Sequence, residues 1–147
     1  MIWLLRHGEA VDAAPGQSDA ERELTDKGRA QASAAGAALR ALGVTIDTCL
    51  ASPRVRARDT ARLACAELAI EVELEPRLQG GRFDPLALAA GRGEQVLLVG
   101  HEPDFSRAVF ELTSAHVQLK KGGLAACEPG RLHALLRPAE LRLIARS

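Results

Sequence analysis

Two short stretches of this chain are apolar without interruption, and they limit the folds that the chain can adopt. Residues 2–5 read Ile-Trp-Leu-Leu and residues 96–99 read Val-Leu-Leu-Val. A strand with one face in water alternates apolar and polar residues, whereas a strand buried on both faces reads as a continuous apolar run. Since such strands occur mainly where helices cover both sides of a parallel sheet, the two stretches predict an α/β protein.

Helical patterns occupy the segments that follow the early strands. Thr25 is a suitable N-cap, and the helix after it is expected to bury an alanine face and to end at Gly43. A second helix is predicted to begin at Ser52-Pro53, because serine is a favoured cap and proline a favoured first residue. The predicted buried face of the first helix consists of Ala30, Ala34, Ala37, Ala38 and Ala41.

The remaining elements continue the alternation of strands and helices. Further strands are expected at residues 47–52 and 71–74, on either side of residues 120–123, and at residues 132–136. Further helices are expected from Asp84-Pro85 to near Gly91 and from Glu102-Pro103 to about Leu112. This order predicts a three-layer α/β/α sandwich, with a mostly parallel central sheet and an antiparallel extension.

Length and composition exclude several classes of protein. A chain of 147 residues is expected to form one domain over residues 1–147, without a disulfide or metal to stabilise it. Its 19 basic residues equal its 19 acidic ones, which argues against nucleic-acid binding. The three cysteines lie in apolar segments without C-x-x-C spacing and are predicted to be buried thiols of a reducing compartment.

No segment has the pattern of a membrane span or of a metal site. The apolar run before Arg6 is too short for a secretory signal or a transmembrane helix, so we expect a cytoplasmic protein without a membrane partner. The sequence contains no H-E-x-x-H, paired C-x-x-C or EF-hand spacing. We therefore expect neither a metal nor another cofactor.

Both apolar runs are followed by residues whose side chains can take part in catalysis or bind a ligand. Arg6 and His7 follow the first run, and His101 follows the second. Ligands of open α/β sheets bind beyond the carboxyl ends of the parallel strands, so these side chains are expected to meet there. The segment after Ser52-Pro53 adds arginines at positions 54, 56 and 58, and helical periodicity does not choose among them.

Two imidazoles and several guanidinium groups at one sheet edge suit a phosphoryl group. Arginine donates two hydrogen bonds to two phosphoryl oxygens and stays charged at any relevant pH. A neutral imidazole is a competent nucleophile, because its unperturbed pKa is about 6.5. His101 precedes a predicted helix N-terminus, where backbone N–H groups favour an anion. The hypothesis is that Arg6, His7, His101 and an arginine of the 54–58 segment surround one phosphoryl group.

Three motifs make the chain similar to the histidine phosphatase superfamily, the phosphoglycerate mutase-like proteins. Residues 5–9 resemble its R-H-G motif, residues 52–61 its S-P-x-x-R-A-x-x-T segment, and residues 99–103 its G-H-x-P segment. The short length and the Lys-Lys-Gly-Gly-Leu-Ala stretch at residues 120–125 resemble the compact SixA-type phosphohistidine phosphatases. The resemblance implies a phosphoglycerate mutase-like fold and a phosphatase activity.

The resemblance also implies roles for individual residues. It makes His7 the residue that accepts the phosphoryl group, with Arg6, Arg56 and His101 forming the phosphate pocket. It thereby selects Arg56 over the two neighbouring arginines. Gly8 and Arg22 are implied to contribute to substrate binding.

One departure from the family pattern concerns the substrate. Larger members of the superfamily carry an acidic proton donor in the loop after the third strand, whereas residues 76–82 here contain no carboxylate. An alkoxide leaving group needs such an acid, while an imidazole needs much less help. The expected substrate is therefore a phosphorylated histidine on a partner protein, such as a phosphotransfer domain or a phosphocarrier. Four carboxylates remain candidates for the acid: Glu9, Glu75, Asp84 and Glu102.

Two other functions compete with this one. A small-molecule phosphomonoesterase of the same superfamily would need a proton donor and a deep specificity pocket. A non-catalytic module that binds phosphate or a phosphoprotein would be expected to lack the Arg-His-Gly motif or the second histidine, and both are intact.

Overall fold

The structure is a computed structural model that describes residues 1–147. Its strands are β1 (Ile2–Arg6), β2 (Thr48–Ala51), β3 (Val72–Leu74), β4 (Val96–Gly100), β5 (Leu124–Glu128) and β6 (Arg131–Leu136). Its α-helices are α1 (Asp26–Ala41), α2 (Val55–Leu68), α3 (Pro85–Ala89), α4 (Asp104–Thr113) and α5 (Pro138–Ala145). Two 3₁₀ turns, η1 (Asp19–Glu21) and η2 (Pro76–Leu78), lie in the loops after β1 and β3.

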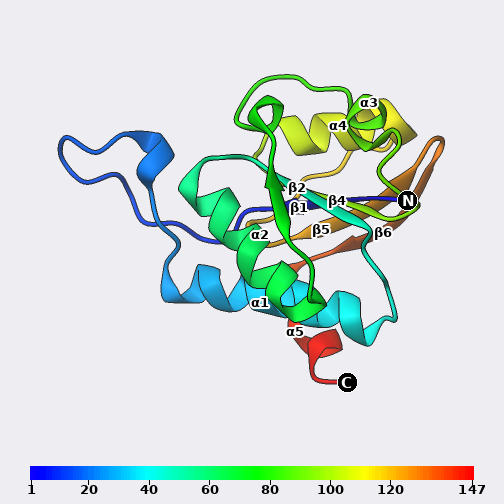
Figure 1. Cartoon of the computed structure of the whole chain (residues 1–147), viewed down its shortest axis with the longest axis horizontal. Coiled ribbons are helices and arrows are strands. Elements are labelled where there is room, and N and C mark those ends of the chain that lie inside the picture. The colour runs from blue at the N-terminus through cyan, green and yellow to red at the C-terminus, as the bar shows by residue number, and fades with distance from the viewer.

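A six-stranded sheet separates two helical layers (Figure 1). The strand order is β3-β2-β4-β1-β5-β6, in which the first four are parallel to one another and the last two are antiparallel. Helices α1, α2 and α5 cover one face, and α3 and α4 cover the other. The predicted α/β/α sandwich with an antiparallel extension is therefore confirmed.

The two apolar runs become the adjacent central strands, as their composition predicts. In β1, Trp3 and Leu5 pack toward α1, α2 and α5, while Ile2 and Leu4 pack toward α3 and α4. Every residue of β4 is buried. Burial of apolar surface on both faces explains why residues 2–5 of β1 and all of β4 lack a polar side chain.

Helix α1 starts as predicted but buries a different face. The Thr25 side chain accepts a hydrogen bond from the Gly28 N–H, which confirms the cap. Of the five alanines predicted to be buried, only Ala38 is. The prediction was wrong because alanine occurs on every side of this helix, so the alanine positions do not distinguish its buried face from its exposed face. Gly36 lies on the true contact face, where a Cβ would come within 2.2 Å of the Ala64 carbonyl oxygen of α2.

Three other expectations differ from the structure. Helix α2 begins at Val55 with Arg54 at its cap position, so Ser52 does not cap it. No strand precedes residues 120–123, and the C-terminal helix α5 was not predicted. None of the helices combines the length and apolar character that a bilayer crossing requires.

Candidate active site

The sheet brings the two histidines together. Strands β1 and β4 are parallel neighbours in which Arg6 is opposite Gly100, so the residues that follow them lie side by side. The rings of His7 and His101 have their centroids 5.3 Å apart. Both residues are buried, with 7% and 6% of their surface exposed. The predicted meeting of these side chains at the carboxyl edge of the sheet is observed.

His7 keeps one ring nitrogen free of a proton. Its Nδ1 lies 2.7 Å from the Gly8 carbonyl oxygen, which can only accept a hydrogen bond, so Nδ1 carries the proton and Nε2 has the lone pair. Burial, aided by the charges of Arg56 and Arg6 and opposed by the bond to Gly8, lowers the pKa of His7 to about 4. His7 is therefore neutral at pH 7.

His101 is held through Nε2, the ring nitrogen that His7 leaves free. Its Nε2 lies 2.8 Å from Oγ of Ser52, which accepts a hydrogen bond from the Arg54 N–H. The Ser52 hydroxyl has no other acceptor, so it donates to Nε2, and the proton of His101 is on Nδ1. Burial lowers the pKa of His101 to about 3, with smaller contributions from His7 and Arg56. His101 thus offers a neutral N–H donor at Nδ1.

Three buried donors beside these rings have no partner in the chain. They are Nδ1 of His101, Nε of Arg6 and Nε of Arg56, and no other buried side-chain nitrogen or oxygen lacks a partner. Arg6 and Arg56 are both close enough to His7 for their charges to lower its pKa. A buried donor without an acceptor costs free energy, so this cluster fits a site that an oxyanion completes.

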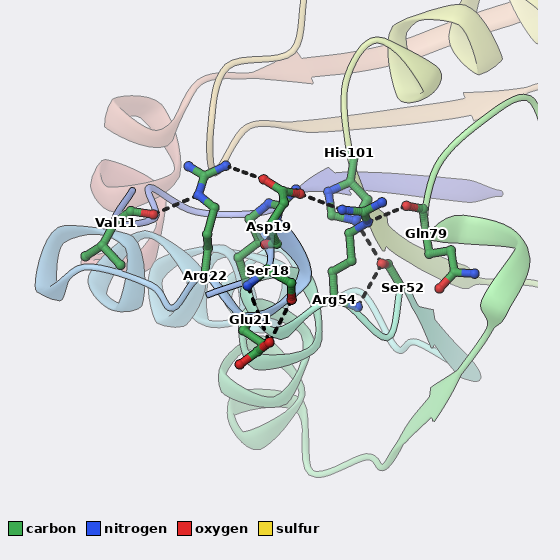
Figure 2. A network of polar contacts seen from close by, with 10 residues as sticks. Val11, Ser18, Asp19, Glu21, Arg22, Ser52, Arg54, Gln79 and His101 are labelled. Atoms are coloured by element: carbon green, nitrogen blue, oxygen red, sulfur yellow. Dashed lines mark hydrogen bonds and ion pairs between the residues drawn. The ribbon is translucent and has the colours of Figure 1, made fainter. Parts of the chain in front are cut away.

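Arg56 belongs to a cluster of arginines around the carboxylate of Asp19, and Figure 2 shows Arg22 and Arg54 of this cluster beside Asp19. The Asp19 carboxylate accepts from Arg54 at 2.5 Å, from Arg56 at 3.0 Å and from Arg22 at 3.1 Å. Hydrogen bonds from Arg22 and Arg56 hold the pKa of Asp19 below its ordinary value. The structure therefore brings the predicted Arg22 and Arg56 together and adds Arg54 to them. Arg58 instead pairs with Asp59.

Gly8 has a use other than the predicted contact with substrate. Its N–H donates to Oγ1 of Thr60 at 3.0 Å, and Thr60 donates in turn to the Arg56 carbonyl. A Cβ at Gly8 would lie 2.5 Å from the Gly28 carbonyl oxygen. Both backbone polar groups of Gly8 are engaged, so this residue orients His7 and leaves no free donor for a ligand.

The carboxylates considered as proton donors are all engaged with other partners. Glu75 accepts from Arg77, and Asp84 caps α3. Glu102 accepts from the backbone N–H and hydroxyl of Ser106, and Glu9 accepts from the Thr25 hydroxyl.

Asp19, the carboxylate that does contact the arginines of the site, was not singled out from the sequence. Asp12 and Glu21 are other carboxylates of the same loop. The spacing of Asp19, three residues before Arg22, is a signal that could have found it.

Comparison with known proteins agrees with this geometry. The model of the histidine phosphatase superfamily (branch 1) matches residues 2–87. An uncharacterized protein of Picosynechococcus sp. is 35% identical over 142 residues, which cover 88% of this chain and 85% of that protein. The mitochondrial serine/threonine-protein phosphatase Pgam5 of Drosophila ananassae is 43% identical over 72 residues, which span 49% of this chain but only 24% of Pgam5.

Solved structures of phosphatases have the same fold. A crystal structure from Agrobacterium tumefaciens, assigned as the phosphohistidine phosphatase SixA, matches with a TM-score of 0.83 and 26% identity over 93% of this chain and 97% of that one. A structure of the protein histidine phosphatase SixA complexed with tungstate matches with a TM-score of 0.80 over 95% of this chain and 98% of that one. At 24% identity, the second match shows the fold alone.

A three-layer fold with paired imidazoles and unpaired guanidinium donors at the carboxyl edge of its sheet is that of an enzyme of phosphoryl chemistry. The chain belongs to the histidine phosphatase superfamily, and it is a phosphatase.

Proposed function

We propose that this phosphatase removes the phosphoryl group from a phosphorylated histidine of a partner protein, through a covalent intermediate on His7. The observation that carries the proposal is the neutral His7: its Nε2 is free, and buried donors of its neighbours His101, Arg6 and Arg56 lack an acceptor. The catalytic residues we propose are Arg6, His7, Arg56 and His101. We also propose that residues 1–147 act as one domain.

In the first step, Nε2 of His7 attacks phosphorus. The Nε2–P bond forms as the N–P bond of the substrate breaks, and the substrate imidazole, protonated on its distal nitrogen, leaves neutral. Arg6 and Arg56 donate through Nε, and His101 donates through Nδ1, to the three equatorial oxygens on which charge is spread. These donors are fixed before the reaction, so their orientation costs little when the charge moves.

In the second step, water hydrolyses the phosphoenzyme. The oxygen of water bonds to phosphorus, the Nε2–P bond breaks, and dihydrogen phosphate leaves with both protons of the water. His7 returns to its neutral form with its proton still on Nδ1, where the Gly8 carbonyl holds it. No metal ion takes part in either step as we propose them.

The state of the nearby carboxylates favours a phosphohistidine substrate. An alkoxide leaving group requires a general acid, which typically contributes about 10²- to 10⁴-fold. Asp19, which contacts the arginines of the site, has its pKa held below the ordinary value and is ionised at neutral pH. The protonated imidazole of a phosphohistidine leaves without such an acid.

A phosphoserine or phosphothreonine substrate is the second candidate. The partial match to Pgam5, a serine/threonine-protein phosphatase, favours it. Rates on phosphohistidine, phosphoserine and p-nitrophenyl phosphate separate the two candidates. A larger kcat/KM on phosphoserine than on phosphohistidine would replace the leading proposal with this one.

Trapping the intermediate tests the mechanism. Radiolabelled phosphohistidine should label the wild-type protein with an acid-labile, alkali-stable bond, and it should not label a His7→Ala variant. His133→Ala is the matched control, because His133 lies on β6 and pairs with Glu128. Label that persists in His7→Ala, or that never forms in the wild type, would contradict the covalent step.

The cysteines bear on the cellular location. Cys49, Cys65 and Cys127 are free and buried, as predicted. Unpaired thiols are typical of reducing compartments, and this supports our proposal of a cytoplasmic protein.

A further inference from the structure

We propose that Asp19 is a positioning residue for the phosphate pocket: it holds Arg22, Arg54 and Arg56 so that the free edge of Arg56 faces the phosphoryl group. This inference rests on the proposed function and adds to it a residue that the family motifs do not contain. Asp19 would act through the arginines and would not touch the substrate.

The contacts of Arg56 carry the inference. Its Nη1 donates to the Asp19 carbonyl oxygen at 2.8 Å, and its Nη2 donates to the Asp19 carboxylate at 3.0 Å. A guanidinium group is planar and rigid, so two fixed terminal nitrogens determine where the third one points. The third nitrogen, Nε, is buried and lacks a partner. Asp19 therefore occupies one edge of Arg56 and leaves the other edge for an oxyanion.

The other two arginines connect Asp19 to separate parts of the site. Arg54 donates through Nε to the Gln79 carbonyl, in the loop after β3, and Arg22 donates through Nε to the Val11 carbonyl. The two reach Asp19 from opposite sides (Figure 2). Three guanidinium groups this close repel one another, and the carboxylate among them offsets that repulsion.

The turn that carries Asp19 is itself held in place. Asp19 is the first residue of η1, and the Ser18 hydroxyl at its cap donates to the Glu21 carboxylate at 2.8 Å. The Asp19 side chain is 53% exposed. Exposed ion pairs contribute little to stability, so removing this carboxylate is expected to change the site far more than the fold.

Asp19→Asn is the direct test, because the amide keeps the size of the side chain and removes its charge. We expect a fall of about 10²-fold in kcat/KM on phosphohistidine, mostly in kcat, since displacement of a catalytic group by about 1 Å can have that effect. Tungstate, measured by calorimetry, should bind about 10-fold more weakly. Asp19→Glu should recover part of both losses, because it restores a carboxylate.

The control is Asp26→Asn, which removes a carboxylate that pairs with Arg29 at the start of α1. It should match the wild type in every measurement, and all variants should unfold within a few degrees of the wild type. Wild-type rates in Asp19→Asn, or tighter binding of tungstate, would overturn the proposal, because the carboxylate would then be idle or a competitor of the substrate. If the wild type binds tungstate but does not hydrolyse phosphohistidine, the proposed function fails and the tungstate affinities still decide the role of Asp19.

Discussion

The imidazole half and the guanidinium half of the site are built differently. His7 and His101 follow central strands and are fixed by the sheet: the His7 N–H donates to the Gly100 carbonyl, and its own carbonyl accepts from the Gly122 N–H. Arg22, Arg54 and Arg56 come from a loop and from the start of α2, and they meet on the partly exposed Asp19.

The difference shows how one site combines two physical requirements. A nucleophilic imidazole must be neutral, and burial against apolar strands lowers its pKa. Guanidinium groups must stay charged: burial lowers the pKa of Arg56, and its hydrogen bond to the Asp19 carboxylate opposes that effect. The sheet therefore supplies the proposed nucleophile together with Arg6, and the start of α2 and the loop before α1 supply the arginines around Asp19.

Removing His7, the proposed nucleophile, should have the largest effect. His7→Ala is expected to lower kcat on phosphohistidine by about 10⁴-fold or more, because no other side chain can form the covalent intermediate. Steady-state kinetics measure the loss, and tungstate binding shows whether the guanidinium half survives. Loss of tungstate binding together with activity would show that the two halves do not act separately.

Removing charge from the guanidinium half should have the next largest effect. Arg56→Ala is expected to lower kcat/KM by about 10²- to 10³-fold, the usual effect of losing a donor to a developing oxyanion. Arg58→Ala is the matched control, since Arg58 lies on the same helix and pairs with Asp59. Equal losses in the two variants would mean that the cluster around Asp19 has no special role.

The activity that depends on the imidazole half should be lost in acid, when His7 takes up a proton. The pKa of His7 is lowered to about 4, so the neutral form persists as the pH falls and is lost only below that value. We expect kcat/KM, corrected for spontaneous hydrolysis, to be unaffected by His7 from pH 7 to 5 and to fall about tenfold per pH unit below 4. An NMR titration of the His7 ring that gave a midpoint near 6.5 would contradict the burial argument.

The same two rings should make the fold less stable in mild acid. Unfolded histidines take up protons near pH 6.5, while the buried rings stay neutral to about pH 4 and 3. The unfolded state thus binds more protons in this range, and the free energy of unfolding should decrease as the pH falls below 6.5. Urea unfolding at pH 7 and pH 5 measures the change, and it should be smaller in His101→Asn.

The smallest effect is expected where the two halves touch. Ser52→Ala removes the hydroxyl that joins His101 to the backbone of Arg54, and it should lower kcat about 5-fold, as expected for one hydrogen bond. Thermal unfolding should show a cost of about 1–3 kcal/mol, because buried polar groups lose their partner. Thr113→Ala, which removes a hydroxyl at the end of α4, is the control for kcat.

Much of the fold could be predicted because its signals are local. Uninterrupted apolar runs indicated β1 and β4, and the Thr25 cap indicated the start of α1. The buried face of α1 could not be predicted, since Gly28 and Gly36 are buried where backbone comes into close contact, and this depends on the partner segment.

The candidate site also has one part that local sequence signals predict and one part that depends on contacts between distant segments. The sequence by itself determined that each of two histidines follows a buried strand. Because β1 and β4 are parallel neighbours in the sheet, the two histidines lie together at its carboxyl edge. Only the tertiary structure decided that Arg54 joins Arg56, that Ser52 holds His101 and that Asp19 lies among three arginines. The contacts of Asp19 with Arg54 and Arg56 and that of Ser52 with His101 join segments about 35 to 50 residues apart. Long polar side chains reach partners that periodicity along one helix or strand does not reveal.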